Sequence, residues 1–110
     1  MKPVRLRTLP SWAPMGGLTL GRTIWLKRSM VHALTHEWVH VEQQERYGVL
    51  GFLLRYLFSP AWRVRLEAPA YAESVKAGVD IYRCAKALSG PLYLWPCTYV
   101  EARRAIEACA

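Results

Sequence analysis

A five-residue pattern, H-E-x-x-H, sets the first requirement on the structure of this chain, and it stands at residues 36–40. On a helix, His36 and His40 lie four positions apart, so both imidazoles project from one face and can bind a single tetrahedral Zn²⁺. Glu37 then lies beside them, where its carboxylate can take a proton from a metal-activated water without itself binding the metal. The pattern therefore predicts a helix here, together with a second element that supplies a further ligand.

The sequence around the motif favours this helix. Residues 31–47 contain neither Gly nor Pro, and Leu34, Trp38 and Val41 have the i, i+4, i+7 spacing of a face that packs on a core. His32 lies one turn before His36, and we expect it to be a packing or surface residue rather than a ligand. A neighbouring face of the same helix carries His36, His40, Gln43 and Tyr47.

Proline and glycine divide the rest of the chain into short segments. Pro69 is tolerated in the first turn of a helix, where backbone N–H groups have no helical partner, and so predicts a helix start at 65–67. We expect an irregular segment at 1–16, a hairpin or two short strands at 17–30, a short apolar helix on the core at 52–58, and further helices at 65–88 and 98–109. The tryptophans are expected to anchor the core or an interface: Trp12, Trp25, Trp38, Trp62 and Trp95.

Length and composition favour one domain, residues 1–110, because a chain of 110 residues with 53% hydrophobic content can bury a modest single core. Three cysteines at unrelated spacings predict neither a disulfide framework nor a cysteine-based zinc site. Prolines and glycines interrupt the basic amino-terminal region, which argues against a signal peptide, and the longest apolar stretch, 49–58, is too short to span a bilayer. We therefore expect a cytoplasmic protein without a transmembrane segment, and the sequence leaves its oligomeric state open.

The net charge of +7 favours acidic partners, but the fifteen Lys and Arg residues are scattered along the chain. A solvated basic face explains them better than a specific nucleic-acid interface does. The alternative is a metal-binding module without hydrolytic activity, whose basic residues meet nucleic acid or an anionic membrane. The residues considered for that surface are Arg63, Arg65, Arg103 and Arg104.

A catalytic zinc site of this type needs a third protein ligand and an open position for water. No histidine follows His40, so the third ligand must be a carboxylate. Glu42 and Glu45 share the motif helix but turn away from the histidines or lie beyond reach. Glu67 fits best, because small residues follow it in the sequence EAPAY and would let two helices approach closely around a metal, whereas Glu73 points to a different side.

Three segments together resemble the gluzincin metallopeptidases, specifically the minimal single-domain ones: TIWLKR at 23–28, HEWVHVEQ at 36–43, and the E-x-x-A-Y pattern that begins at Glu67. The resemblance covers residues 18–75. It implies an α+β, mainly helical fold in which the motif helix and the glutamate helix pack with a small antiparallel β element. It further implies Zn²⁺ bound by His36, His40 and Glu67, with Glu37 as general base. The edge strand that aligns a peptide or protein substrate would be Thr23, Ile24, Trp25, Leu26, Lys27 and Arg28.

This sequence departs from the family at one position. Many members place an Asp four residues after the glutamate to orient a ligand histidine, whereas Tyr71 occupies that position here, so we expect Tyr71 to contact the ligands. The donor to the oxyanion stays open among Tyr71, Tyr82, Tyr93, Tyr99 and an arginine. The predicted function is a zinc-dependent metallopeptidase, held latent by its amino-terminal segment or by residues 92–110.

Overall fold

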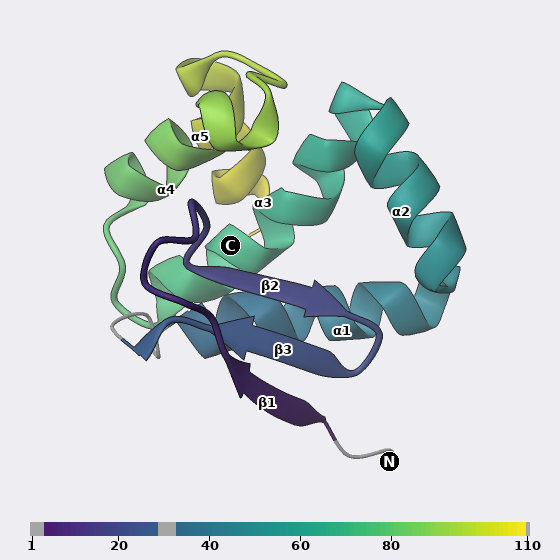
Figure 1. Ribbon diagram of the computed structural model, residues 1–110. Coiled ribbons are helices and arrows are strands. Elements are labelled where there is room, and N and C mark those ends of the chain that lie inside the picture. Colours follow the sequence, from purple (N-terminus) through teal and green to yellow (C-terminus); the bar gives the residue numbers. More distant parts are fainter. Residues whose placement is uncertain (1–3, 29–32, 110) are drawn as a thin grey trace.

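The computed structural model describes residues 4–28 and 33–109, and in them the chain is α+β, with five α-helices and a small mixed sheet (Figure 1). The expectation of a mainly helical α+β fold is confirmed. The expected start of the motif helix, at 31, and His32 lie outside the described residues. No helix in the described part of the chain has the length and apolar character needed to cross a membrane.

The sheet consists of β1 (Arg5–Thr8), β2 (Gly17–Leu20) and β3 (Thr23–Leu26) in the order β1-β3-β2. β2 and β3 form the expected antiparallel pair, joined by a turn at Gly21, whose φ of +59° suits glycine. β1 pairs with β3 in parallel, inside the segment expected to be irregular. β1 has the sequence RLRT, in which only Leu6 is apolar, and all four residues are exposed. Its sequence therefore lacks the alternating apolar pattern that would predict a strand.

The position of β3 corrects the expectation for the substrate strand. β3 is hydrogen-bonded on both sides, to β1 and to β2, so residues 23–26 form the central strand rather than an edge. The two edge strands are β1 and β2. Of these, β2 packs directly against α1, the helix that carries the motif (Figure 1).

The helices follow one another with short connections. Gly48, with a φ of 75°, ends the first of them, and a capping box between Thr98 and Glu101 begins the last. The bounds are α1 (Leu34–Tyr47), α2 (Val49–Phe58), α3 (Pro60–Lys76), α4 (Ile81–Leu88), a 3-10 turn η2 (Pro91–Tyr93) and α5 (Tyr99–Ala108).

The expected single helix at 65–88 is wrong in both its start and its extent. The Ser59 side chain accepts a hydrogen bond from the backbone N–H of Trp62, and Pro60 occupies the first helical position, so α3 begins before Arg65. Pro69 consequently lies inside α3 rather than in its first turn. α3 ends before Gly78, whose φ is +104°, and the chain then forms a separate helix, α4.

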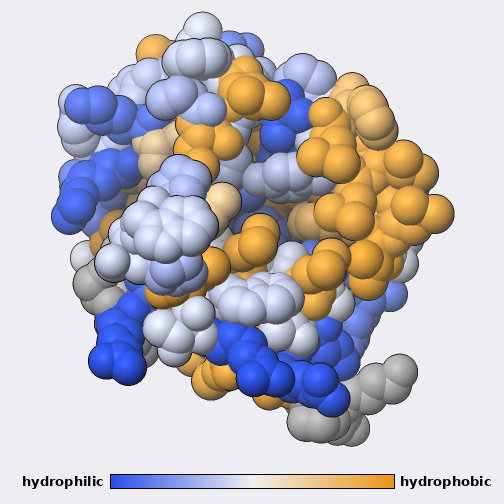
Figure 2. All heavy atoms as spheres, viewed as in Figure 1, coloured by the Kyte–Doolittle hydropathy of each residue, from blue (hydrophilic) through white to orange (hydrophobic). Residues whose placement is uncertain are grey.

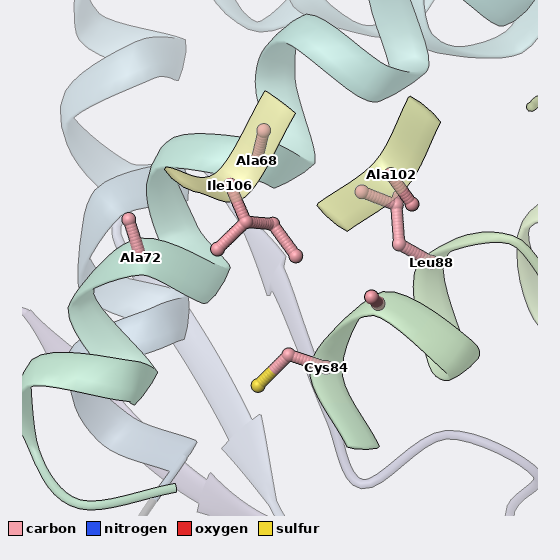
Figure 3. Close-up of a cluster of buried hydrophobic side chains, with 7 residues drawn as sticks. Ala68, Ala72, Cys84, Leu88, Ala102 and Ile106 are labelled. Carbon is pink, nitrogen blue, oxygen red and sulfur yellow. The ribbon is translucent and has the colours of Figure 1, made fainter. Parts of the chain in front are cut away.

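The hydrophobic core lies where α3, α4 and α5 meet, and Figure 3 shows its side chains. Small residues of α3 let the other two helices approach closely. The members of the cluster are Ala68, Ala72, Cys84, Ala85, Leu88, Ala102 and Ile106. α1 packs on the opposite side of α3 and lies between α3 and the sheet.

Three of the five tryptophans do not anchor the core, and the other expectation for them, a role at an interface, stays a prediction. The side chains of Trp12 and Trp95 are 82% and 68% exposed, and Trp38 is 37% exposed. α1 instead buries a mainly polar face, because the residues beside Val41 turn their side chains toward α3 and β2. α2 buries only Phe52, so the expectation that it covers the core with its apolar residues is also wrong.

Candidate metal centre

The two motif histidines and one glutamate meet in the interior, between α1 and α3. The Oε1 atom of Glu67 lies 2.9 Å from Nε2 of His36 and 2.9 Å from Nε2 of His40. All three side chains are buried, and their ligand atoms lie within 4.8 Å of one another. Among the described residues, these three are the His, Cys, Asp or Glu side chains that lie close enough together to hold one metal ion.

The dimensions of this group fit a zinc ion. Ligand bonds of about 2.0–2.1 Å in tetrahedral geometry place the ligand atoms roughly 3.3 Å apart. Zn²⁺ would therefore move Oε1 of Glu67 slightly away from each histidine nitrogen and draw in any ligand atoms that lie farther apart, up to 4.8 Å. Two nitrogen ligands and one carboxylate oxygen are also a ligand set that zinc accepts in catalytic sites. His36, His40 and Glu67 could therefore hold the ion through these three atoms.

Gln43 determines which nitrogen of His40 faces the group. Its side-chain Nε2 donates to the carbonyl of Leu66 at 2.8 Å, which fixes the orientation of the amide. Its Oε1 then lies 3.0 Å from Nδ1 of His40 and accepts the Nδ1 proton, leaving Nε2 directed at Glu67. Sequence reasoning placed Gln43 on the correct face of α1 but gave it no role.

Tyr71 contacts the ligands as expected, although not by the hydrogen bond that an aspartate would make. Its ring packs edge-on against the His36 ring, with centroids 4.4 Å apart. Its hydroxyl lies 2.8 Å from the hydroxyl of Tyr93, which comes from η2. Tyr71 therefore limits the movement of the His36 ring by packing.

Glu37 is buried beside the group without joining it. Its Oε2 lies 3.9 Å from Nε2 of His36, and its Oε1 accepts a hydrogen bond of 3.0 Å from the Thr19 hydroxyl. Gly17 makes room for this side chain, since a Cβ there would lie 3.0 Å from Cγ and Cδ of Glu37. Burial raises the pKa of Glu37 above its usual range, because desolvation outweighs the nearby histidines.

Tyr56 is a residue of the site that sequence reasoning missed. Its hydroxyl donates a hydrogen bond of 2.5 Å to Oε2 of Glu67, the carboxylate oxygen that does not face the histidines. Burial, together with the negative charge of Glu67, raises the pKa of Tyr56 well above its usual value, so the hydroxyl keeps its proton. No sequence spacing connects α2 with Glu67, and only the packing of α2 against α3 brings them together.

The charges of the group are strongly coupled. Burial alone would lower the pKa of His40, but the charge of Glu67 and its hydrogen bond raise it to about 9. Burial would likewise raise the pKa of Glu67, yet His40 and His36 hold it well below its usual range. Without a metal, Glu67 is therefore a carboxylate held by imidazole N–H groups.

Two cavities adjoin the group. One, of about 280 Å³, is lined by residues of β2, α1, α2, α3 and η2, and the other, of about 250 Å³, lies on the side of Tyr71. Gly17, Leu18 and Thr19 of β2 line the first cavity, whereas no residue of 23–28 lines either one. The strand beside the site is thus β2, and the expected substrate residues of 23–28 do not reach the cavities.

Met15 and Leu92 line both cavities, so the amino-terminal segment and residues 92–110 both border the site.

Several other candidates lie elsewhere. Glu45 pairs with Arg22, and Glu73 pairs with Lys76 at 3.3 Å. Tyr82 packs against Tyr99, with ring centroids 5.5 Å apart. None of the acids or tyrosines in these pairs lines the two cavities.

Arg63 is not part of an exposed basic surface. It is 6% exposed, and its guanidinium donates to the carbonyls of Tyr56 and Leu57 at the end of α2, and to the carbonyl of Tyr93. It therefore satisfies carbonyls that have no partner within α2.

Compared with protein families, curated proteins and solved structures, this chain has no match. Its function is therefore inferred from the residues of the site and from the motifs that they carry.

Proposed function

We propose that this chain binds Zn²⁺ through His36, His40 and Glu67 and hydrolyses peptide bonds, as a minimal gluzincin-type metallopeptidase. The observation that carries the proposal is the meeting of a buried carboxylate from α3 with both motif histidines, 2.9 Å from each Nε2. The open cavity at this point gives a substrate access to the group.

Bound zinc would lower the pKa of a water molecule toward neutrality and polarise the carbonyl of the scissile peptide bond. Glu37 takes the proton of the attacking water and delivers it to the amine that leaves. The Thr19 hydroxyl holds one oxygen of Glu37, so the other oxygen, Oε2, is available for this transfer on the side of His36. The raised pKa of Glu37 increases its basicity, as a proton acceptor requires.

Tyr56 is placed to stabilise the negative charge that develops on the carbonyl oxygen. Its ring lines the 280 Å³ cavity, and its hydroxyl lies next to Glu67 at the ligand group. Because its pKa is raised, Tyr56 keeps its hydroxyl proton at neutral pH. That proton is donated to Oε2 of Glu67, so in this role the hydroxyl would turn from Glu67 to the carbonyl oxygen of the substrate. We assign this role to Tyr56 in preference to Tyr82 and Tyr99, which lie outside the cavity.

The outer edge of β2 is the place for an extended peptide. Gln44 already donates to the carbonyl of Thr19, which identifies the edge of β2 that faces away from β3. Because peptide groups alternate along a strand, the backbone groups of Gly17 point to this same edge and are placed for strand addition.

The first experiment measures zinc by elemental analysis in the wild type and in Glu67→Ala. About one zinc per chain is expected in the wild type, with a sharp loss in the variant, because two histidines alone bind zinc weakly. Glu73→Ala is the matched control, since it removes an acid from the same helix without touching the group. A wild type that holds no zinc when zinc is supplied would contradict the proposal.

The second experiment separates hydrolysis from metal binding. Glu37→Gln should keep its zinc and abolish cleavage of a quenched fluorescent peptide library, whereas Glu42→Gln, an exposed change on the same helix, should leave both unchanged. Zinc binding without cleavage by the wild type would favour the alternative, a metal-binding module without hydrolytic activity.

A further inference from the structure

The outer face of α2 is apolar and exposed. Leu50, Leu54 and Leu57 are spaced i, i+4, i+7 on this ten-residue helix and are 70%, 51% and 60% exposed. Phe58, at its end, is 78% exposed. Figure 2 shows the hydrophobic side chains gathered into one continuous patch over α2, on the right of the view. Monomeric soluble proteins rarely leave so much apolar surface together without a partner for it.

The charged residues of the segment that contains α2 are all arginines, and the exposed Glu45 just before this segment pairs with Arg22. Between Glu45 and Glu67 the sequence contains four arginines and no acidic residue. Arg46 and Arg65 are exposed, one before α2 and one after it. Arg65 lies over the ring of Trp62 at 5.2 Å, and Arg55 lies over the rings of Tyr47 and Trp62 at 5.0 and 5.1 Å, so aromatic side chains accompany the arginines.

An apolar helix face flanked by arginines and aromatic rings is the composition of a helix that lies in a membrane interface. α2 is about 15 Å long at 1.5 Å per residue, which is half the thickness of a hydrocarbon core. It would therefore lie parallel to the surface. A second copy of the chain fits the patch less well, since a two-fold contact would bring the arginines of one copy near those of the other without an acid from this region to pair with them.

We propose that α2 docks this protein on the surface of an anionic lipid bilayer, with Leu50, Leu54 and Phe58 in the interface and Arg46 and Arg65 at the lipid phosphates. This surface is separate from the metal ligands, so the inference stands or falls independently of zinc binding and hydrolysis. Leu57 both belongs to the patch and lines the 280 Å³ cavity, which places the candidate site next to the bilayer.

The experiment is sedimentation of the full chain with vesicles of phosphatidylcholine alone or mixed in equal parts with phosphatidylglycerol. We expect binding to the anionic vesicles, at least tenfold weaker binding to the neutral ones, and weakening with added salt. The double variant Leu50→Asp/Leu54→Asp should lose at least tenfold in affinity for the anionic vesicles. Leu6→Asp is the matched control, because Leu6 is 61% exposed on β1, away from α2, and this variant should bind like the wild type.

Circular dichroism checks that each variant is folded. If the double variant does not fold, Arg46→Gln/Arg65→Gln takes its place, and it should weaken binding to the anionic vesicles alone. The proposal is overturned if the wild type ignores anionic vesicles, or if the folded double variant binds them as the wild type does. It is also overturned if light scattering shows a dimer that the α2 variants dissociate, because a second copy would then cover the patch.

Discussion

Gln43 shows how a single side chain can orient a candidate metal ligand. It accepts the Nδ1 proton of His40 and donates to the carbonyl of Leu66, the residue that precedes Glu67. The same amide thus connects a ligand on α1 with the backbone beside a ligand on α3. Residues that orient metal-binding histidines in this way raise the affinity of the site.

Replacing Gln43 with Leu should weaken zinc binding by about 10- to 100-fold, because the tautomer and the ring orientation of His40 lose their support. A competition titration with a chelator measures the change. Gln43→Glu keeps an acceptor for Nδ1 but loses the donor to the Leu66 carbonyl, so it should recover only part of the affinity. Equal affinities in the wild type and Gln43→Leu would exclude this role.

The raised pKa of His40 predicts a pH dependence for the metal-free protein. The protonated form is favoured in the fold, so its contribution to stability is complete below pH 6.5, the ordinary pKa of histidine, and is lost as the pH rises through about 9. In the presence of a chelator, the thermal midpoint should fall over this range. His40→Gln should remove most of this dependence of the thermal midpoint on pH, and an unchanged dependence in that variant would assign the effect to other groups.

Zinc affinity should rise over the same pH range, because zinc binding displaces the proton of His40.

At the scale of elements, the close approach of β2 to α1 determines where Glu37, the proposed general base, lies. Gly17 of β2 leaves space for Glu37, while Thr19 of β2 donates to its carboxylate. Gln44 of α1 in turn donates to the carbonyl of Thr19, which holds the strand against the helix. Two hydrogen bonds and one small residue thus position the carboxylate of Glu37.

Gly17→Ala should therefore reduce peptide hydrolysis by at least tenfold while zinc content stays near one per chain. The added Cβ would lie 3.0 Å from Cγ and Cδ of Glu37 and displace the carboxylate. Elemental analysis and the peptide assay measure the two quantities on the same sample. Unchanged hydrolysis would show that the position of Glu37 tolerates the displacement.

The elements also differ in how far they could be predicted. The motif helix followed from residues without Gly or Pro, and α1 was found close to its predicted place. The start of α3 was missed because it was placed from Pro69 alone, although a serine cap followed by proline, here Ser59-Pro60, is equally the beginning of a helix. β1 was missed because its stability comes from pairing with β3, eighteen residues away in register.

For the whole molecule, the candidate metal group connects the two halves of the fold. The chain is compact, with a radius of gyration of 13.1 Å, and α1 lies between the sheet and α3. The main hydrophobic cluster lies on the other side of α3, among α4 and α5. His36 and His40 join α1 to Glu67 of α3, so a bound ion would fasten the sheet-bearing half to the cluster.

Zinc should consequently stabilise the folded chain. Free zinc at 100 times its dissociation constant adds about 2.7 kcal/mol, which raises the thermal midpoint by on the order of 10 °C. The midpoint with zinc and with chelator, measured by circular dichroism, gives the difference. Glu67→Ala should show little of it, and an equal rise in that variant would place the ion elsewhere.

The sequence by itself determined what depends on local geometry. The four-residue spacing of His36 and His40 puts both on one helix face whatever surrounds them, and the lack of a later histidine directed attention to Glu67. Tertiary structure alone decided that Tyr56 donates to Glu67, that β2 rather than β3 borders the site, and that α2 keeps its apolar face exposed. These features depend on which element faces meet, and such contacts join residues that no helical or strand period relates.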